Sequence, residues 1–349
     1  MHPTIEPSLK LIASDNSTVQ GDPTTWQSEL RHSCRSLGEL LDTLQISQTE
    51  QTLVFARDQA AKDFPLQVTP SFINRIKKGD VNDPLLKQIL PDAKELKQVD
   101  GFSIDPLQET SSNPLPGLLH KYQSRALLTI ASSCAVNCRY CFRRHFPYKQ
   151  NNPSKAQWMP AIEYLSDNSS INEVIYSGGD PLMVNDLFLA WLNEKLNTIP
   201  SLQRLRIHSR LPVVLPNRIT PAFIDSLNRW SRQTVMVIHC NHPREIDSSV
   251  EKAVQLLKAA NITVLNQSVL LKGINDNSDV LAELSETLFN IGVMPYYLHQ
   301  LDAVQGAAHF EVDETRAKQL QEELLGKLAG FLVPKFVREI AGEPNKTPL

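Results

Sequence analysis

The stretch SSCAVNCRYCFRRHF, residues 132–146, decides how this chain is interpreted. It places Cys134, Cys138 and Cys141 in a CxxxCxxC pattern, and no fourth cysteine lies nearby in the sequence. A structural zinc site normally takes four protein ligands, whereas an iron-sulfur cluster held by three thiolates keeps one iron open. The pattern therefore favours a catalytic cluster. The alternatives are a zinc knuckle completed by His145 and three cysteines that are close by chance.

The spacing of these cysteines, with the aromatic Tyr140 directly before the last one, resembles that of the radical S-adenosylmethionine (SAM) enzymes. The resemblance implies a 4Fe-4S iron-sulfur cluster whose open iron binds the amino and carboxylate groups of SAM. In these enzymes one electron from the reduced cluster cleaves SAM to methionine and a 5'-deoxyadenosyl radical. The resemblance therefore implies radical chemistry.

The composition is that of an ordinary globular protein, with 41% hydrophobic residues and a formal net charge of -3 over 349 residues. No apolar run approaches the length of about 18 residues that spans a membrane, and the first residues, MHPTIEPSLK, lack the features of a signal peptide. We expect no nucleic-acid or membrane partner and a cytoplasmic location. Five cysteines, three of them clustered, suit a reducing compartment. Cys34, in a predicted helical stretch, and Cys240, after an apolar strand, are interpreted as buried thiols without a role.

The chain divides into three predicted parts: a mainly helical cap and connector (1–118), a barrel (119–312), and a C-terminal helix and tail (313–349). In the barrel, β-rich runs are predicted at 126–132, 173–177, 204–208, 234–239, 263–270 and 294–299. Helices are predicted around 155–166, 186–198, 221–231, 247–260, 278–291 and 313–330. Strands that alternate with helices imply parallel pairing through right-handed crossovers. The predicted fold class is α/β, a partial (β/α)6 radical SAM barrel, with a doubly wound sheet as the alternative.

Polar residues follow the predicted strands at equivalent points. They are the Cys134 loop, Ser177-Gly178-Gly179-Asp180, His208-Ser209-Arg210, His239-Cys240-Asn241-His242, Asn266 with Gln267, and His299 with Asp302. In a βα barrel the functional groups gather where strands end, so we expect one polar face. Gly178 and Gly179 allow the backbone to approach a ligand and Asp180 to turn inward. The SGGD motif resembles the element with which radical SAM enzymes bind the amino group of SAM.

A denser resemblance extends over nearly the whole chain. It is carried by PSFINRIKKGDVNDPLLKQIL, whose pattern predicts two short helices, and by HKYQSRALLTIASSCAVNCRYCFRRHF, IYSGGDPL, IHSRLPVVLPNRI, NHPREI, LNQSVLLKGINDN, MPYYLHQLDAVQGAAHF and NKTPL. These stretches resemble the lysine 2,3-aminomutases, radical SAM enzymes that also use pyridoxal 5'-phosphate (PLP). RRHFPY, GAAHF and GEPNKTPL resemble the shorter bacterial subgroup, the elongation factor P (EF-P) β-lysylation enzymes.

This resemblance assigns roles at the cofactor site. It implies that Lys346 forms the Schiff base with PLP, a reaction for which lysine is generally used. Lys121 and Arg125 match the basic residues near the PLP phosphate. His239 and Gln267 match barrel residues that line the cofactor site.

It also assigns roles at the substrate site. Arg143 matches the arginine that pairs with the substrate carboxylate, a role suited to a planar bidentate donor. Asp302 matches a carboxylate that receives the terminal ammonium of the substrate. Glu339 stands where the aminomutases have a supporting Asp, and Gly342-Glu343-Pro344-Asn345 replaces their glycine run, so substrate pose and product stereochemistry stay open. The chain ends three residues after Lys346, and we do not expect the zinc site of the longer members.

The resemblance implies an isomerase that converts L-lysine to β-lysine, favouring the R enantiomer. A 5'-deoxyadenosyl radical and a PLP aldimine of lysine would support the 1,2-amino shift. The expected partners are L-lysine, an electron donor for the cluster and, functionally, EF-P and its lysylation ligase. The alternatives are a radical SAM and PLP enzyme for glutamate or arginine, a methylthiotransferase, which the absence of a second cysteine cluster disfavours, and a non-catalytic iron-sulfur or zinc module.

Overall fold

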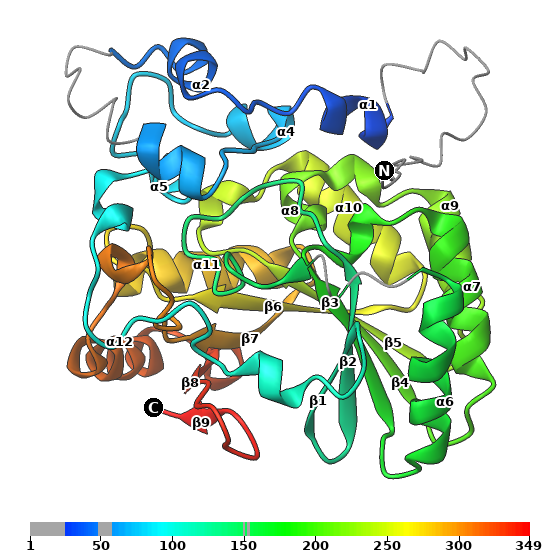
Figure 1. Cartoon of the computed structure of the whole chain (residues 1–349). Coiled ribbons are helices and arrows are strands. Elements are labelled where there is room, and N and C mark those ends of the chain that lie inside the picture. The colour runs from blue at the N-terminus through cyan, green and yellow to red at the C-terminus, as the bar shows by residue number, and fades with distance from the viewer. Residues whose placement is uncertain (1–24, 48–57, 149–150, 152–153) are drawn as a thin grey trace, which may run out of the picture.

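The structure is a computed structural model that describes residues 25–47, 58–148, 151 and 154–349. Its centre is an open sheet of nine strands that follow one another in chain order (Figure 1). The strands are β1 (Leu118–Tyr122), β2 (Arg125–Ala131), β3 (Glu173–Gly178), β4 (Arg204–Ser209), β5 (Gln233–His239), β6 (Thr263–Val269), β7 (Met294–His299), β8 (Lys335–Arg338) and β9 (Thr347–Pro348). Strands β2 to β8 are parallel, whereas β1 and β9 pair antiparallel at the two edges.

The predicted α/β class and partial barrel are confirmed. The six predicted strands correspond to β2 through β7, with each end within one residue. The sequential strand order excludes the doubly wound alternative, because such a sheet reverses its order at a switch point. Sequence patterning missed β1, β8 and β9. These strands are short. Their sequences, LLHKY, KFVR and TP, contain no apolar alternation long enough to predict a strand.

Helices follow the parallel strands, and all six predicted helices are confirmed. They are α6 (Met159–Asp167), α7 (Asp186–Asn197), α9 (Pro221–Leu227), α10 (Ser248–Ala259), α11 (Ser278–Asn290) and α12 (Glu314–Lys327). Five begin at a side chain that accepts a hydrogen bond from the first turn, namely Asn185, Thr220, Asp247, Asn277 and Asp313. Such caps satisfy backbone N–H groups that the helix itself leaves unpaired. The shorter turns are α8 (Leu211–Val214), η4 (Ala156–Trp158), η5 (Pro181–Met183), η6 (Pro216–Arg218), η7 (Pro243–Glu245), η8 (Ala308–Phe310) and η9 (Gly330–Leu332).

The helices of the N-terminal segment pack along one side of the barrel, at the top of Figure 1, and the rest of the segment runs down to β1. Its elements are α1 (Trp26–Arg31), α2 (Leu37–Thr43), α4 (Pro70–Ile73), α5 (Pro84–Lys87), η1 (Ala93–Leu96) and η2 (Glu109–Ser112). Helices α4 and α5 confirm the two short helices expected over 70–90. The prediction that Cys34 lies in a helix is wrong, because α1 ends at Arg31 and Cys34 exchanges two backbone hydrogen bonds with Val68.

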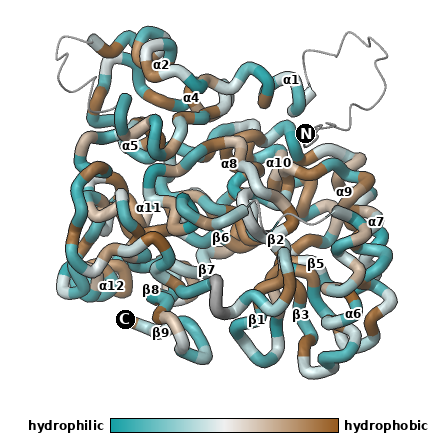
Figure 2. The backbone as a smooth tube through the Cα atoms, in the orientation of Figure 1, coloured by the Kyte–Doolittle hydropathy of each residue, from teal (hydrophilic) through white to brown (hydrophobic). Residues whose placement is uncertain are grey.

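One apolar core joins this segment to the barrel. Phe72 and Leu86 belong to the same cluster of buried residues as Leu211 and Val214. The Thr69 hydroxyl donates to the carbonyl of Val214, which adds a buried polar link. Figure 2 shows hydrophobic stretches recurring along the strands and along helices α7 and α9 beside them. The division of the chain at 118/119 and 312/313 stays a prediction.

Within the described residues, no helix has both the length and the apolar character needed to cross a membrane.

Candidate active site

A cavity of about 480 Å³ opens at the carboxyl ends of the parallel strands. All fifteen residues to which the sequence resemblance assigns a role line this cavity. They are Lys121, Arg125, Cys134, Cys138, Cys141, Arg143, Ser177, Gly178, Gly179, Asp180, His239, Gln267, Asp302, Glu339 and Lys346. The structure therefore brings together residues that lie more than two hundred positions apart in the sequence.

The cluster loop follows β2 and presents its three cysteines to the cavity. Burial raises the pKa of the Cys141 thiol to about 11, and the neighbouring Cys138 adds to this effect. The amide side chain of Gln67 anchors the loop by donating to the Cys134 carbonyl at 2.8 Å. His145 is exposed, and its ring lies 3.2 Å from the carbonyl of Gln305, outside the residues that line the cavity. This placement separates His145 from the three thiols that the zinc-knuckle alternative would have joined to it.

Among the described residues, no group of three or more His, Cys, Asp or Glu side chains is arranged to hold a single metal ion. A four-iron cluster makes a different demand, because each cysteine binds a separate iron.

Gly178 and Gly179 let the end of β3 approach the cluster loop. A Cβ on Gly179 would lie 2.5 Å from the Ser133 carbonyl oxygen. A Cβ on Gly178, which has φ +119, would lie 2.5 Å from the Ala131 carbonyl oxygen. A side chain at either position would therefore displace backbone, so close backbone packing explains both glycines. Their contact with SAM stays a prediction.

Asp180 uses its carboxylate within the protein. It accepts hydrogen bonds from the Ser209 hydroxyl at 2.7 Å and from the backbone N–H groups of Leu182 at 3.0 Å and Arg210 at 2.7 Å. Rather than pointing a free carboxylate at a ligand, Asp180 joins the loop after β3 to the end of β4. The contact of Asp180 with SAM stays a prediction.

The edge hairpin explains the spacing of Glu339 and Lys346. Strands β8 and β9 pair antiparallel, with Arg338 opposite Thr347, so the residues next to this pair face each other. Lys346 Nζ donates to Glu339 Oε2 at 2.6 Å. Burial opposes ionisation of Glu339, yet the Lys346 ammonium lowers its pKa to about 2. The tail that sequence patterning left without structure is therefore a strand that presents Lys346 to the cavity.

Glu339 also receives two donors from β1. The Tyr122 hydroxyl lies 3.2 Å from Glu339 Oε1, and Lys121 Nζ lies 3.5 Å from the same oxygen. The guanidinium of Arg125 stacks over the Tyr122 ring at 4.2 Å. The basic residues assigned to PLP thus lie beside the assigned PLP lysine.

Arg143 is paired with a carboxylate that sequence reasoning missed. Its Nε and Nη2 donate to Glu109 at 2.7 and 2.8 Å, and its Nη1 donates to the Ser177 hydroxyl at 2.9 Å. Glu109 also lies 3.5 Å from Lys121 Nζ. Burial opposes ionisation of Glu109, but Arg143 outweighs it and lowers the pKa. No motif marked Glu109, because it lies in the short turn η2 of the connector before β1, which has no sequence pattern of its own.

Asp302 faces the same end of the cavity as Glu339. Desolvation, followed by the charge of Glu339, raises the pKa of Asp302 to about 7. Because each carboxyl group disfavours the negative charge of the other, a bound cation at this site would be stabilised by both.

His239 and Gln267 lie opposite each other where β5 and β6 pair. His239 Nε2 lies 3.0 Å from the Tyr140 hydroxyl, and the two rings stack with centroids 5.7 Å apart. Burial lowers the pKa of His239 to about 3, so the ring is neutral. Asn266, although also at a strand end, hydrogen-bonds the backbone of Cys240 and is not among the cavity residues.

Comparison with known proteins shows the family to which the chain belongs. The sequence profile of the Radical SAM superfamily matches residues 128–284. L-lysine 2,3-aminomutase of Escherichia coli (strain K12) is 51% identical over 93% of this chain and 94% of its own length. The chain belongs to the lysine 2,3-aminomutase family. The family member named L-lysine 2,3-aminomutase from Haemophilus influenzae is 54% identical, over 82% of this chain and 85% of its own.

Among solved structures, a radical SAM methyltransferase from Sphaerobacter thermophilus is similar with a TM-score of 0.45 and 16% identity, covering 63% of this chain and 68% of that one.

As a member of the lysine 2,3-aminomutase family, the protein is an isomerase that uses a 4Fe-4S cluster, SAM and PLP. The cavity fits these groups. Three thiols from the loop after β2 and the lysine ammonium next to β9 both line it. His208 Nε2 and Arg210 Nε are buried without a hydrogen-bond partner in the described part of the chain, and both residues line the cavity. Buried polar atoms are rarely left unpaired, so these two indicate room for a bound molecule.

Proposed function

We propose that this protein converts L-lysine to β-lysine by moving the amino group from Cα to Cβ. One observation carries the proposal: Asp302, whose pKa is raised to about 7 by desolvation and then by Glu339, faces a cavity that also contains Arg143. A substrate with a carboxylate at one end and an ammonium at the other matches those charges. Lysine is such a molecule.

The same charges argue against glutamate. A second carboxylate on the substrate would meet Asp302 and Glu339, whose charges already oppose each other. Like charges at close range in a desolvated site cost several kcal/mol, as an order of magnitude. The terminal ammonium of lysine reverses the sign of this interaction.

We assign the cofactor and substrate contacts as follows. Cys134, Cys138 and Cys141 hold the cluster, and Ser177, Gly178, Gly179 and Asp180 form the SAM side of the cavity. Lys346 binds PLP with Lys121 and Arg125 near its phosphate, and His239 and Gln267 line the cofactor site. When bound, the cluster and SAM supply a radical that removes hydrogen from Cβ, and PLP supplies the conjugated system through which nitrogen migrates.

The chain's own residues orient the reactants. Glu109 and Ser177 fix the guanidinium of Arg143, so it keeps one orientation in which to receive the substrate carboxylate. Glu339 stays ionised at neutral pH and holds the Lys346 ammonium toward the cavity. Such preorganisation lowers the entropic cost of bringing reactive groups together.

The cavity wall also limits water. Apolar side chains that line it include Leu107, Leu119, Val136, Val214 and Leu301. A water-poor cavity keeps a reactive radical from side reactions and strengthens the charge pairs inside.

The use of the product is part of the proposal. The stretches RRHFPY, GAAHF and GEPNKTPL support the EF-P β-lysylation subgroup, so we propose that β-lysine, as the R enantiomer, supplies the ligase that modifies EF-P. A one-electron donor must reduce the cluster. Because such clusters and free thiols require reducing conditions, we propose that the reaction takes place in the cytoplasm.

The test is anaerobic incubation of reconstituted protein with L-lysine, SAM, PLP and dithionite, followed by chiral analysis of the products. We expect (R)-β-lysine, and no product when L-glutamate replaces lysine. A parallel incubation uses Asp302→Asn with the same iron, sulfide and PLP contents. Less product from this variant then reflects the loss of the Asp302 charge and not a loss of cofactor. Failure of the wild-type protein to form β-lysine would refute the proposed reaction.

A further inference from the structure

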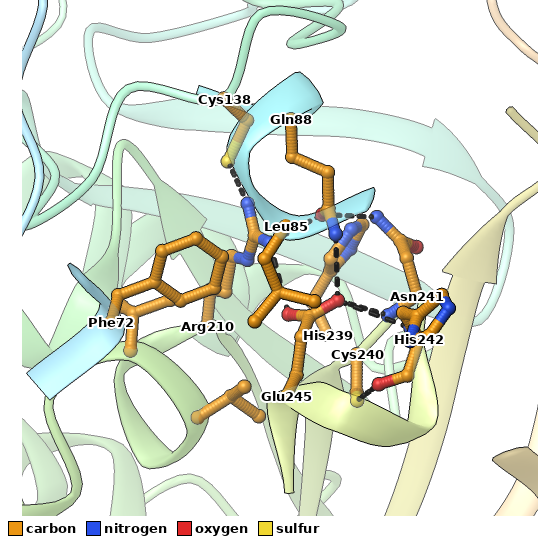
Figure 3. A network of polar contacts seen from close by, with 12 residues as sticks. Phe72, Leu85, Gln88, Cys138, Arg210, His239, Cys240, Asn241, His242 and Glu245 are labelled. Atoms are coloured by element: carbon orange, nitrogen blue, oxygen red, sulfur yellow. Dashed lines mark hydrogen bonds and ion pairs between the residues drawn. The ribbon is translucent and has the colours of Figure 1, made fainter. Parts of the chain in front are cut away.

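Arg210 makes a direct contact with one of the cluster cysteines. It follows β4, and its Nη1 lies 2.6 Å from Cys138 Sγ (Figure 3). The two residues are far apart in the sequence and meet only because the end of β4 lies beside the cluster loop. An arginine is a permanent cation, so this contact brings a positively charged hydrogen-bond donor to the sulfur.

Two side chains fix the second terminal nitrogen of the Arg210 guanidinium, Nη2. Arg210 Nη2 donates to Gln88 Oε1 at 2.6 Å and to Glu245 Oε2 at 3.0 Å. Glu245 is fully buried, and its second oxygen accepts from the backbone N–H of Asn241 at 3.0 Å and from that of His242 at 3.1 Å. Figure 3 shows these residues converging from the N-terminal segment and from the loop after β5.

Aromatic rings and the backbone restrain Arg210 further. Its guanidinium lies 5.3 Å from the ring centroid of Phe72 and 5.7 Å from that of Tyr140. Asp180 accepts a hydrogen bond from the Arg210 backbone N–H at 2.7 Å. The side chain therefore has one orientation, and in that orientation a donor points at Cys138.

We propose that Arg210 is a positioning residue that raises the reduction potential of the iron-sulfur cluster through its charged hydrogen bond to Cys138, with Gln88 and Glu245 holding the guanidinium in place. The proposal rests on Cys138 being a cluster ligand and is independent of the identity of the substrate. No bond is made or broken: one electron passes from a low-potential one-electron donor, such as dithionite, to the cluster.

The direction of the shift in reduction potential follows from the charge of Arg210. Reduction adds one negative charge to the cluster, and a nearby cation stabilises that charge more than it stabilises the oxidised cluster. Hydrogen bonds to cluster sulfurs, net charge and solvent exposure set iron-sulfur potentials over a wide range. Arg210 supplies both a hydrogen bond to a cluster sulfur and a positive charge. It does so at a buried position, where water screens the interaction little.

The experiment is an EPR-monitored redox titration of the reconstituted protein without SAM or lysine, so that neither ligand contributes to the potential. Arg210→Met removes the charge at similar length, Arg210→Gln removes it but keeps an N–H donor, and Arg210→Lys keeps it. Arg218→Met is the matched control, because Arg218 is also buried and is paired with Asp186 but does not line the cavity. Iron and sulfide content is measured for every variant.

We expect Arg210→Met and Arg210→Gln to lower the equilibrium constant for reduction at least tenfold, equivalent to about 59 mV toward more negative potential. Arg210→Lys should recover part of the shift, and Arg218→Met should titrate like the wild type. Neutral variants that load the cluster fully and titrate at the wild-type potential would overturn the proposal. Loss of the cluster from both neutral variants, while Arg210→Lys loads normally, would also overturn it by showing that Arg210 retains the cluster rather than tunes it.

Because substrate is absent, this result is independent of the proposed reaction. A protein that makes no β-lysine can still show the Arg210 shift, and a protein that makes β-lysine can still lack it.

Discussion

The two ends of the cavity hold their cations in different ways. At the cluster end, the Arg210 side chain and its partner Glu245 are 8% and 0% exposed, and Arg210 also contacts Gln88 and a cysteine sulfur. At the lysine end, Lys346 and Glu339 are 23% and 18% exposed, and the contact between them is a single hydrogen bond. A guanidinium fork is fixed by several acceptors at once, whereas an ammonium on a flexible stem can change partners. The cluster end is therefore preorganised, and the lysine end can exchange its contacts for those of PLP and substrate.

The largest effect is expected at the exchangeable end. Lys346→Ala should abolish the visible absorbance of PLP attached to lysine and lower β-lysine formation by more than about 10³-fold, because a covalent catalytic group is lost. Absorbance spectra and anaerobic assays measure both. Lys335→Ala, at an exposed lysine of β8, is the control and should change neither. A Lys346→Ala protein that keeps the PLP absorbance band would disprove the assignment of Lys346.

The loop that carries the three cysteines is also held by a buried ion-pair cluster outside the cavity, which is tested through stability. Glu95 binds Arg139 at 2.5 Å and Arg144 at 2.9 Å, and the Arg139 and Glu95 side chains are 0% and 1% exposed. Glu95→Gln should lower the free energy of unfolding by about 3–5 kcal/mol, because it leaves buried guanidinium groups without an anion. Urea denaturation measures this change. Glu194→Gln, in an exposed pair with Arg229, should leave the midpoint unchanged, and an equal response of both variants would contradict the contrast between buried and exposed pairs.

Substrate charge recognition is expected to have a smaller effect. Asp302→Asn should lower kcat/KM for lysine about 100-fold, equivalent to about 2.7 kcal/mol, because the substrate ammonium loses a charged partner in a desolvated cavity. Steady-state kinetics measure the change, and iron, sulfide and PLP contents should match those of the wild type. Activity near the wild-type value would remove Asp302 from the substrate site.

The smallest effect is a dependence of KM on pH. Desolvation and the charge of Glu339 raise the pKa of Asp302 to about 7, so at lower pH this carboxyl is protonated and cannot pair with an ammonium. KM for lysine should therefore fall as pH rises from about 6 to about 8, by up to about tenfold per unit below the pKa. The other charges acting on Asp302 are Lys346, Glu109 and Lys121. Asp302→Asn should flatten the profile, and an equally steep profile in that variant would assign the titration to another group.

Local sequence patterns predicted six of the seven parallel strands, β2 to β7, and the helices that follow them. The helical periodicity of α10 and α11 and the apolar runs of β5 and β6 are read within one short window each. Patterning failed at β8 and β9, because a four-residue and a two-residue strand are specified by the edge they join rather than by their own sequence.

The residues of the candidate site also divide into those that a local sequence pattern predicted and those that it missed. Residues within recognisable motifs, such as Cys141 and Lys346, were predicted and line the cavity. Glu109 and Gln88 were not, although one pairs with Arg143 and the other holds Arg210. Both come from segments whose only local signal is helical or irregular, so their partners could be identified only in three dimensions.

By itself, the sequence determined the chemistry available to this protein: three thiols at CxxxCxxC spacing, a lysine near the C-terminus, and alternating strands and helices that build a parallel sheet. Those features depend on residue type and on neighbours a few positions away. Only the tertiary structure decided which charges meet, because the pairs Arg143 with Glu109, Lys346 with Glu339 and Arg210 with Cys138 depend on strand order and register. Coulombic and hydrogen-bond energies depend on distance and burial, and neither can be read from separation along a chain.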